Sequence, residues 1–179
     1  MIDHDKYFKI LNDRLKCANQ SLTLYTVGGF ALKCYGLKST MDIDAFYDAN
    51  ETIEKIIEDI GNEYKINPIG EHWINKAVAY LKDKRVKNPG KEFSEKLIEL
   101  SNLEVYKANL DYLLVMKVFA VYDNKKDKIK HLDDAIKIIK SGKINIKTKE
   151  DFVKLFKKYG YENIEDLLLT VKEILQEIN

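Results

Sequence analysis

The sequence predicts an α/β fold of the α+β kind, in which a small mixed sheet is backed by helices and followed by a helical C-terminal half. Two observations predict this fold. Short β-rich runs occupy residues 21–27, 41–47 and 103–108, and apolar residues at helical spacing fill the segments between them. From residue 111 onward the periodic segments all have helical spacing. The sheet should therefore come from the first part of the chain.

The first half of the chain is expected to alternate helices with strands. Its expected helices span residues 4–19, 30–35, 51–60 and 72–81. Its expected strands span residues 21–27, 41–47 and 63–66. Gly36 should end the second helix, and the Asn50 side chain should cap the third, because asparagine is a preferred N-cap residue. The second strand should lie beside the first and be antiparallel to it or nearly so.

The second half of the chain is expected to return once to the sheet and then to stay helical. The strand at 103–108 follows the Asn88-Pro89-Gly90 turn, and the strongly apolar helix at 111–122 should pack under the sheet. Further helices are expected at residues 129–140 and, as a pair, within 148–178.

Length and composition predict a soluble globular protein. The chain has 179 residues, of which 45% are hydrophobic and 33% are charged. We predict one domain over residues 1–140 and a helical extension over residues 141–179 packed on it. No apolar run reaches membrane-spanning length, and the N-terminal segment lacks the apolar core of a signal peptide. We expect a cytoplasmic protein with no membrane partner.

Net charge and cysteine content say little about binding partners. The formal net charge is +1, which neither favours nor excludes nucleic acid. Basic residues gather at Lys82, Lys84, Arg85, Lys87 and Lys91, and at Lys125, Lys126, Lys128 and Lys130. These stretches are either solvated faces or a surface for RNA or nucleotide phosphates. Cys17 and Cys34 fit no metal-binding spacing, and Cys34 is expected to be a reduced core residue.

The segment at residues 26–47 carries the strongest functional signal. Gly28 and Gly29 end an apolar strand and open a short helix, so phosphates could approach the backbone closely there. Asp42 and Asp44 lie at alternate positions of the next strand, so their carboxylates should point to the same face. Paired carboxylates repel each other unless a divalent cation lies between them. Capping of turns or pairing with Lys38 is the alternative role for the two aspartates.

These motifs resemble the minimal nucleotidyltransferase superfamily, which includes DNA polymerase β. The segment His72-Trp73-Ile74-Asn75 resembles the Trp-Leu-Asn element of a bacterial group of nucleotidyltransferase-like proteins. The segment Tyr112-Leu113-Leu114-Val115-Met116-Lys117 resembles the Leu-Leu-x-Met-Lys helix of that group. The same group is related to AbiEii-type toxins of toxin–antitoxin and phage-defence systems. The resemblance covers residues 20–140 and implies a nucleotidyltransferase-like domain.

The resemblance implies a role for several residues. Gly28 and Gly29 would cradle a nucleoside triphosphate, and Asp42 and Asp44 would bind Mg²⁺ or Mn²⁺. Lys38 and Thr40 would contact phosphate or position the strand, although the Lys38-Ser39-Thr40 segment is also an ordinary loop. Lys117 would neutralise phosphate charge, unless it extends along the apolar helix to the surface.

A third carboxylate is the weakest part of the resemblance. Asp134 is the first candidate, followed by Asp127 and then Glu104, and each is also compatible with a simple surface acid. His131 stands where relatives carry the first Asp of an Asp-x-x-Asp-like element.

The Trp-Leu-Asn element also departs from the relatives. Lys76 replaces the Asp that often follows this element in them. Trp73 and Asn75 either contact a base or ribose, or form a buried tryptophan with a capping asparagine.

We therefore predict a magnesium-dependent nucleotidyltransferase that moves a nucleoside monophosphate from a nucleoside triphosphate to an acceptor hydroxyl. The acceptor would be RNA (such as tRNA), a protein side chain or a small molecule. A toxin–antitoxin or phage-defence role with an antitoxin partner follows from the resemblance. The alternative is a nucleotide- or RNA-binding module that kept the fold and lost efficient catalysis. A third possibility is a protein-interaction role for the helices within 148–178.

Overall fold

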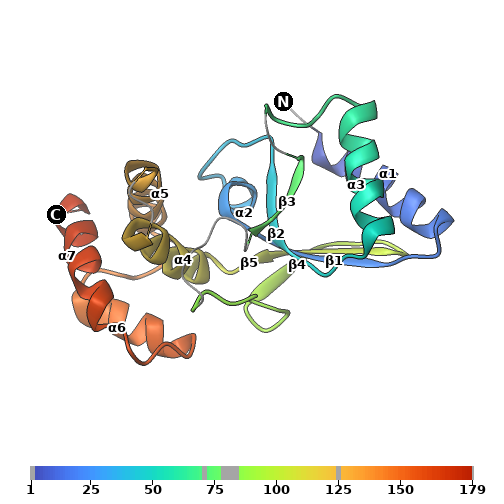
Figure 1. Cartoon of the computed structure of the whole chain (residues 1–179). Helices are drawn as coiled ribbons and strands as arrows, with labels where there is room; N and C mark the ends of the chain where they lie inside the picture. The colour runs from blue at the N-terminus through green and yellow to red at the C-terminus, as the bar shows by residue number, and fades with distance from the viewer. Residues whose placement is uncertain (1–2, 70–71, 78–84, 124–125, 179) are drawn as a thin grey trace. The chain divides into compact units, whose positions relative to one another are not determined.

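The computed structural model describes residues 3–69, 72–77, 85–123 and 126–178. The chain divides into two compact units. The first comprises residues 1–79 and 88–108, and the second comprises residues 80–87 and 109–179. The α/β expectation is confirmed, because the first unit contains a mixed sheet and the second is helical (Figure 1).

A mixed sheet organises the first unit, and its described strands follow the order β3-β2-β1-β5-β4. The strands are β1 (Leu22–Val27), β2 (Ile43–Phe46), β3 (Ile74–Lys76), β4 (Ser94–Glu99) and β5 (Leu103–Ala108). β1 pairs antiparallel with β2, as predicted, and parallel with β5. β4 pairs antiparallel with β5 through a register shift between Lys96 and Ile98.

Two helices, α1 (His4–Cys17) and α3 (Glu51–Glu63), pack against each other and share one hydrophobic core with the sheet (Figure 1). α3 begins where predicted, because the Asn50 side chain accepts a hydrogen bond from the Ile53 amide at 3.0 Å. Alternate strand residues such as Leu24 and Ile43 face this core. Within each strand, the residues that alternate with these core-facing positions must therefore face the opposite side of the sheet.

Three predictions for the first unit are wrong. Residues 63–66 form no strand, because α3 continues to Glu63 and a turn follows. The predicted helix at 72–81 is instead strand β3 over residues 74–76, and its remainder at 78–81 lies outside the described residues. Cys34 lies at the end of α2 (Gly28–Cys34) and is exposed instead of buried in the core.

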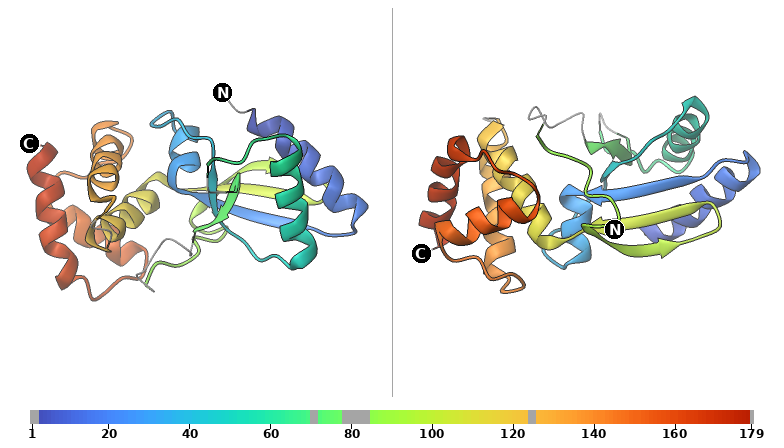
Figure 2. Two further views of the ribbon diagram at one scale, coloured as in Figure 1. Left: turned by 45° about the horizontal axis from the view of Figure 1, so that its top comes forward. Right: turned by 90° about the horizontal axis from the view of Figure 1, so that it is seen from below.

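The second unit is a group of helices around the apolar helix α4 (Leu110–Asp123). Its other helices are α5 (Lys128–Lys140), α6 (Lys149–Lys158), the 3-10 helix η2 (Glu165–Leu167) and α7 (Leu168–Ile178). α4 is buried along almost its whole length, because α5, α6 and α7 pack around it within this unit (Figure 2). α4 is thus the central helix of this unit, and its predicted packing under the sheet stays a prediction.

The helical elements of the second unit otherwise match the prediction. A capping box formed by Thr148 and Asp151 begins α6, as the Thr-x-x-Asp spacing favours. The predicted domain boundary at residue 140 falls inside this unit, between α5 and α6. Within the described residues, no helix is both long and apolar enough to cross a membrane.

Candidate functional site

The sheet places the two predicted metal-binding aspartates on one face. Asp44 lies in β2 opposite Val27 of β1, and Asp42 lies two residues earlier, just before β2 begins. Their neighbours Ile43 and Ala45 are fully buried in the core shared with α1 and α3. Because strand side chains alternate, Asp42 and Asp44 point to the opposite face. Both residues are partly exposed.

Gly28 lies directly against the Asp44 carboxylate, and Gly29 lies against Thr40. Gly28 follows Val27 with a φ of +59°, and a Cβ atom placed on it would lie 2.5 Å from Asp44 Oδ2. A Cβ atom on Gly29 would lie 3.1 Å from Thr40 Oγ1. Glycine is therefore required at position 28 both by the backbone conformation and by the carboxylate beside it. The glycine turn and the aspartates form one site.

The loop between α2 and β2 completes this site. The Thr40 hydroxyl donates a short hydrogen bond to Asp42 Oδ1, which holds the carboxylate toward the loop. Lys38 is half-buried in the same loop. Thr40 thus lies beside Asp42 and contacts its carboxylate through the side-chain hydroxyl.

The residues of this site fit a magnesium or manganese ion that is shared with a phosphate ligand. Mg²⁺ in nucleotide sites keeps several waters and takes only one or two carboxylates from the protein. Asp42 and Asp44 supply these two carboxylates on one face. Across the described residues, no group of three His, Cys, Asp or Glu side chains gathers into a complete metal site. A metal bound here would take Asp42 and Asp44 as its protein ligands, with water and substrate completing the coordination.

Lys117 and Asp134 pair with each other in the second unit. Lys117 Nζ of α4 lies 2.8 Å from Asp134 Oδ2 of α5, with the two side chains 9% and 2% exposed. His131 Nδ1 lies 3.5 Å from the same ammonium group. Burial, followed by the neighbouring Lys117 charge, lowers the pKa of His131 to about 4, so this imidazole is neutral at pH 7. Lys117 therefore does not extend to the surface.

We expect removal of one partner of the buried Lys117–Asp134 pair to destabilise the protein strongly, and replacement of both partners by apolar side chains to destabilise it little. Lys117→Met alone would leave a buried carboxylate without its cation and should lower the free energy of unfolding by about 3–5 kcal/mol. The double variant Lys117→Met/Asp134→Leu should recover most of that loss, because it removes both charges. Urea unfolding of both single variants and the double variant measures the coupling. Additive losses would show that the two side chains are not coupled in the folded protein.

The other two carboxylate candidates lie in different settings. Glu104 of β5 lies 3.1 Å from Lys91 and 3.2 Å from Lys96, and hydrogen bonds from these lysines lower its pKa. It pairs in register with Thr23, near the start of β1, whereas Asp44 lies opposite the last residue of β1. Asp127 precedes α5 and is exposed, without capping the helix through its side chain. Among the described residues of the first unit, Glu104 does not join the aspartate pair as a third ligand, and Asp127 belongs to the second unit.

The basic stretches are partly paired with acids. Arg85 lies 2.8 Å from Asp166, and Lys128 lies 2.8 Å from Glu173. Three other members, Lys82, Lys84 and Lys125, lie outside the described residues.

Trp73 and Asn75 have structural roles. The Trp73 ring is 1% exposed in the core, and its indole nitrogen donates to the Ile57 carbonyl at 2.8 Å. The Asn75 side chain is buried and bridges the amide and carbonyl groups of His72. Lys76, which follows, pairs with Glu54 of α3. The buried-tryptophan alternative is therefore confirmed.

His4, for which the sequence predicts no role, lies beside the loop that carries Asp42. The His4 ring is 5% exposed, and its Nε2 atom lies 3.3 Å from the Met41 carbonyl oxygen. A lone histidine near the N-terminus gives no spacing signal, so only the folded chain reveals this contact.

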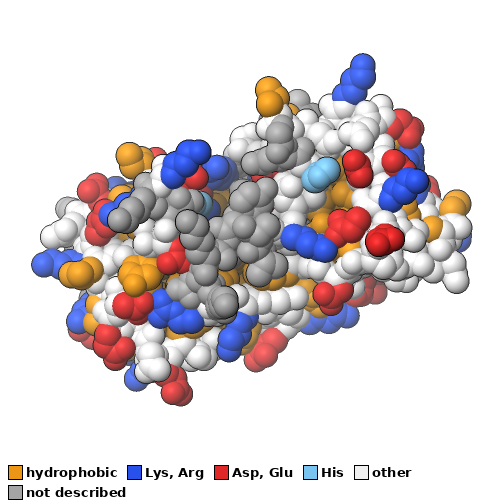
Figure 3. Space-filling view, in the orientation of Figure 1, with side chains coloured by type: hydrophobic (Ala, Val, Ile, Leu, Met, Phe, Trp, Pro, Cys, Tyr) orange, Lys and Arg blue, Asp and Glu red, His pale blue; other side chains and the backbone are white. Residues whose placement is uncertain are grey.

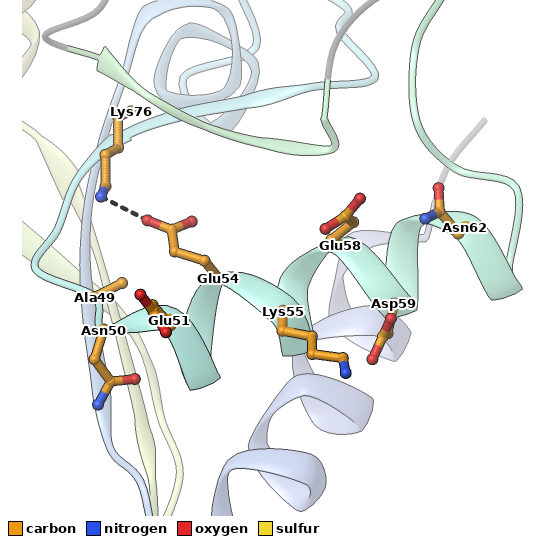
Figure 4. A pocket seen from close by; sticks show the side chains of 9 residues that line it. All are labelled: Ala49, Asn50, Glu51, Glu54, Lys55, Glu58, Asp59, Asn62 and Lys76. Atoms are coloured by element: carbon orange, nitrogen blue, oxygen red, sulfur yellow. Dashed lines mark ion pairs between the residues drawn. The ribbon is translucent and has the colours of Figure 1, made fainter.

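A groove with a volume of about 520 Å³ follows α3 in the first unit (Figure 4). Its charged lining residues are Glu51, Glu54, Lys55, Glu58, Asp59 and Lys76. Lys76 crosses the groove from β3 to Glu54, as the dashed line in Figure 4 shows. Red carboxylates gather over the same helix in the space-filling view (Figure 3). The lining contains neither aspartate of the candidate site, so the groove is a separate acidic surface.

The fold and the paired carboxylates are those expected of a nucleotidyltransferase, and comparison with known proteins assigns the chain to that class. The chain belongs to the family described as nucleotidyltransferase of unknown function (DUF6036), whose model matches residues 6–174. It is also similar to an antigenic nucleotidyltransferase-like protein from Paracoccidioides brasiliensis, known from its crystal structure. That similarity has a TM-score of 0.47 and 10% identity over 96% of this chain and 87% of that chain. No curated protein matched the chain.

Proposed function

We propose that the protein transfers a nucleoside monophosphate from a nucleoside triphosphate to an acceptor hydroxyl. The observation that carries this proposal is the placement of Asp42 and Asp44 on one sheet face, with Asp44 against the Gly28 backbone. Family membership supports a nucleotide substrate. In the transfer, the acceptor oxygen bonds to the α-phosphorus while the bond to the bridging oxygen of the pyrophosphate breaks. Pyrophosphate and the hydroxyl proton are released.

Each residue of the candidate site has a distinct role in this proposal. Asp42 and Asp44 would hold Mg²⁺ or Mn²⁺, which when bound would neutralise charge that develops on the phosphate oxygens. Gly28 and Gly29 would cradle the triphosphate through their backbone, and glycine at position 28 also lets Asp44 lie directly against that backbone. Thr40 orients Asp42 through its hydroxyl. Lys117 and Asp134 neutralise each other in the second unit, so the proposal rests on residues of the first unit.

Transfer of a radiolabelled α-phosphate tests the proposal. The protein is incubated with each labelled nucleoside triphosphate, Mg²⁺ and either total RNA or cell lysate, with and without EDTA. We expect label on one acceptor class and its complete loss with EDTA, and the labelled species distinguishes RNA, protein and small-molecule acceptors. Absence of label from all four nucleotides, with the protein folded and Mn²⁺ also tried, would contradict transferase activity.

A catalytically weak nucleotide- or RNA-binding module is the second candidate. The observation that favours it is that two of the candidates for a third carboxylate, Glu104 and Asp134, are each paired with lysines. Metal-dependent binding of a nucleoside triphosphate without turnover would support this candidate. The toxin–antitoxin or phage-defence role stays a prediction, and co-purification of a small partner protein from the native host would test it.

A further inference from the structure

We propose that His4 is a positioning residue, which fixes the backbone next to Asp42 and so sets the geometry of the aspartate pair. The inference rests on the proposed function in one respect, namely that Asp42 binds the metal. It adds a residue from α1, which contributes no other group to the site. The argument depends on the two ring nitrogens of His4 and on what each one contacts.

His4 is held firmly at the start of α1. Its ring is 5% exposed and packs against the Phe30 ring of α2, with ring centroids 5.0 Å apart. Nδ1 lies 3.0 Å from Lys33 Nζ, and Nε2 lies 3.3 Å from the Met41 carbonyl oxygen. One imidazole therefore connects α1, α2 and the loop that leads to β2.

These partners assign the tautomer of His4. A lysine ammonium can only donate hydrogen bonds, so Nδ1 must be the acceptor. Nε2 must then carry the proton of the neutral ring and donate it to the Met41 carbonyl. Both contacts are satisfied by this tautomer alone. A charged ring would instead present a second N–H to the Lys33 ammonium.

The Met41 contact matters because Asp42 precedes the first residue of β2. The Met41 side chain is 53% exposed and anchors nothing in the core. On the other side of Asp42, the Ile43 amide donates to the Trp73 carbonyl at 2.8 Å. The backbone of Asp42 is thus fixed by His4 before it and by the sheet after it. Asp44 is fixed by its own pairing with β1, so His4 should act on Asp42 alone.

The test compares His4→Leu, which removes the donor, with His4→Gln, whose amide can still donate to the Met41 carbonyl. His72→Leu is the matched control, because His72 is an exposed histidine elsewhere in the first unit. Two quantities are measured on the protein without nucleotide. The first is the rate of amide hydrogen exchange, and the second is the Mn²⁺ affinity, obtained from the electron paramagnetic resonance signal of free Mn²⁺. In His4→Leu, we expect exchange over residues 38–42 to rise and the Kd for Mn²⁺ to rise by about tenfold. His4→Gln should remain within about threefold of the wild type and His72→Leu should match it.

Amide hydrogen exchange within α3 distinguishes a local effect on residues 38–42 from a general loss of stability. Unchanged exchange over residues 38–42 in His4→Leu would overturn the inference, as would an equal acceleration across α3, which would indicate general loss of stability. Faster exchange over residues 38–42 with unchanged Mn²⁺ affinity would also overturn the inference, because metal binding by Asp42 would then not depend on His4. Failure of the wild type to bind Mn²⁺ would overturn the metal role of the aspartates and with it the proposed function, and loop exchange would then still report the contact itself.

Discussion

Replacing Asp42 and Asp44 together by asparagine is expected to lower nucleotide transfer by at least about 1000-fold, because metal stabilisation of the transition state supplies several kcal/mol. Asparagine keeps the size of each side chain and can still accept the Thr40 hydrogen bond. The folded protein should be at least as stable as the wild type without metal, since two repelling charges are removed. Transfer assays and thermal unfolding with and without Mn²⁺ measure both effects.

Asp48→Asn is the matched control for this variant. Asp48 is exposed and lies just beyond β2, so its loss should leave transfer within about twofold of the wild type, as for a surface substitution. Mn²⁺ should raise the unfolding temperature of the wild type and of Asp48→Asn, but not that of the double variant. Retention of more than a tenth of the wild-type rate by the double variant would rule out the aspartates as the metal ligands.

Gly28→Ala is expected to reduce transfer by about 100-fold, the effect of misplacing a catalytic group by about 1 Å. The new Cβ atom would lie 2.5 Å from Asp44 Oδ2, so the carboxylate must move away from the glycine turn. The positive φ adds backbone strain of about 1–2 kcal/mol for a residue with a side chain. Steady-state transfer rates and urea unfolding of the purified variant measure the two effects separately.

Gly36→Ala is the control that separates the effect of backbone strain from the effect of displacing the Asp44 carboxylate. Gly36 also has a positive φ, of +76°, but a Cβ atom there would meet no described atom within 4 Å. Both alanine variants should therefore lose the stability that backbone strain costs, whereas only Gly28→Ala should also displace Asp44 and lose transfer and Mn²⁺ affinity. Equal activity in the two variants would mean that Asp44 tolerates displacement and is not a metal ligand.

Local patterns predicted that Asp42 and Asp44 lie on one face of the sheet. The alternation of Asp42 and Asp44 with apolar residues fixes which face they share, and the antiparallel neighbour at Val27 then brings Gly28 beside them. The start of α3 was equally predictable, because Asn50 caps it through a contact only three residues away. Such features depend on residues close in sequence, whose geometry is set by backbone periodicity.

Features that depend on distant partners were missed. Residues 74–76 were assigned to a helix, yet β3 forms because β2 offers a free parallel edge to Ile74. β4 was not predicted, because its mostly exposed Ser-Glu-Lys-Leu-Ile-Glu segment lacks a continuous apolar face. Lys117 and Asp134 were assigned separate roles in the site, although the packing of α4 on α5 pairs them. In each case the deciding partner lies on another element.

The two outermost described strands have a consequence for the behaviour of the protein in concentrated solution. An open strand edge can recruit an edge from another molecule and start aggregation. β3 is only three residues long, and β4 carries exposed charges at Glu95, Lys96 and Glu99. The register shift after Lys96 further interrupts the hydrogen-bonding row that a second molecule would need. Both edges therefore oppose strand-by-strand growth and should help the native protein to stay dispersed.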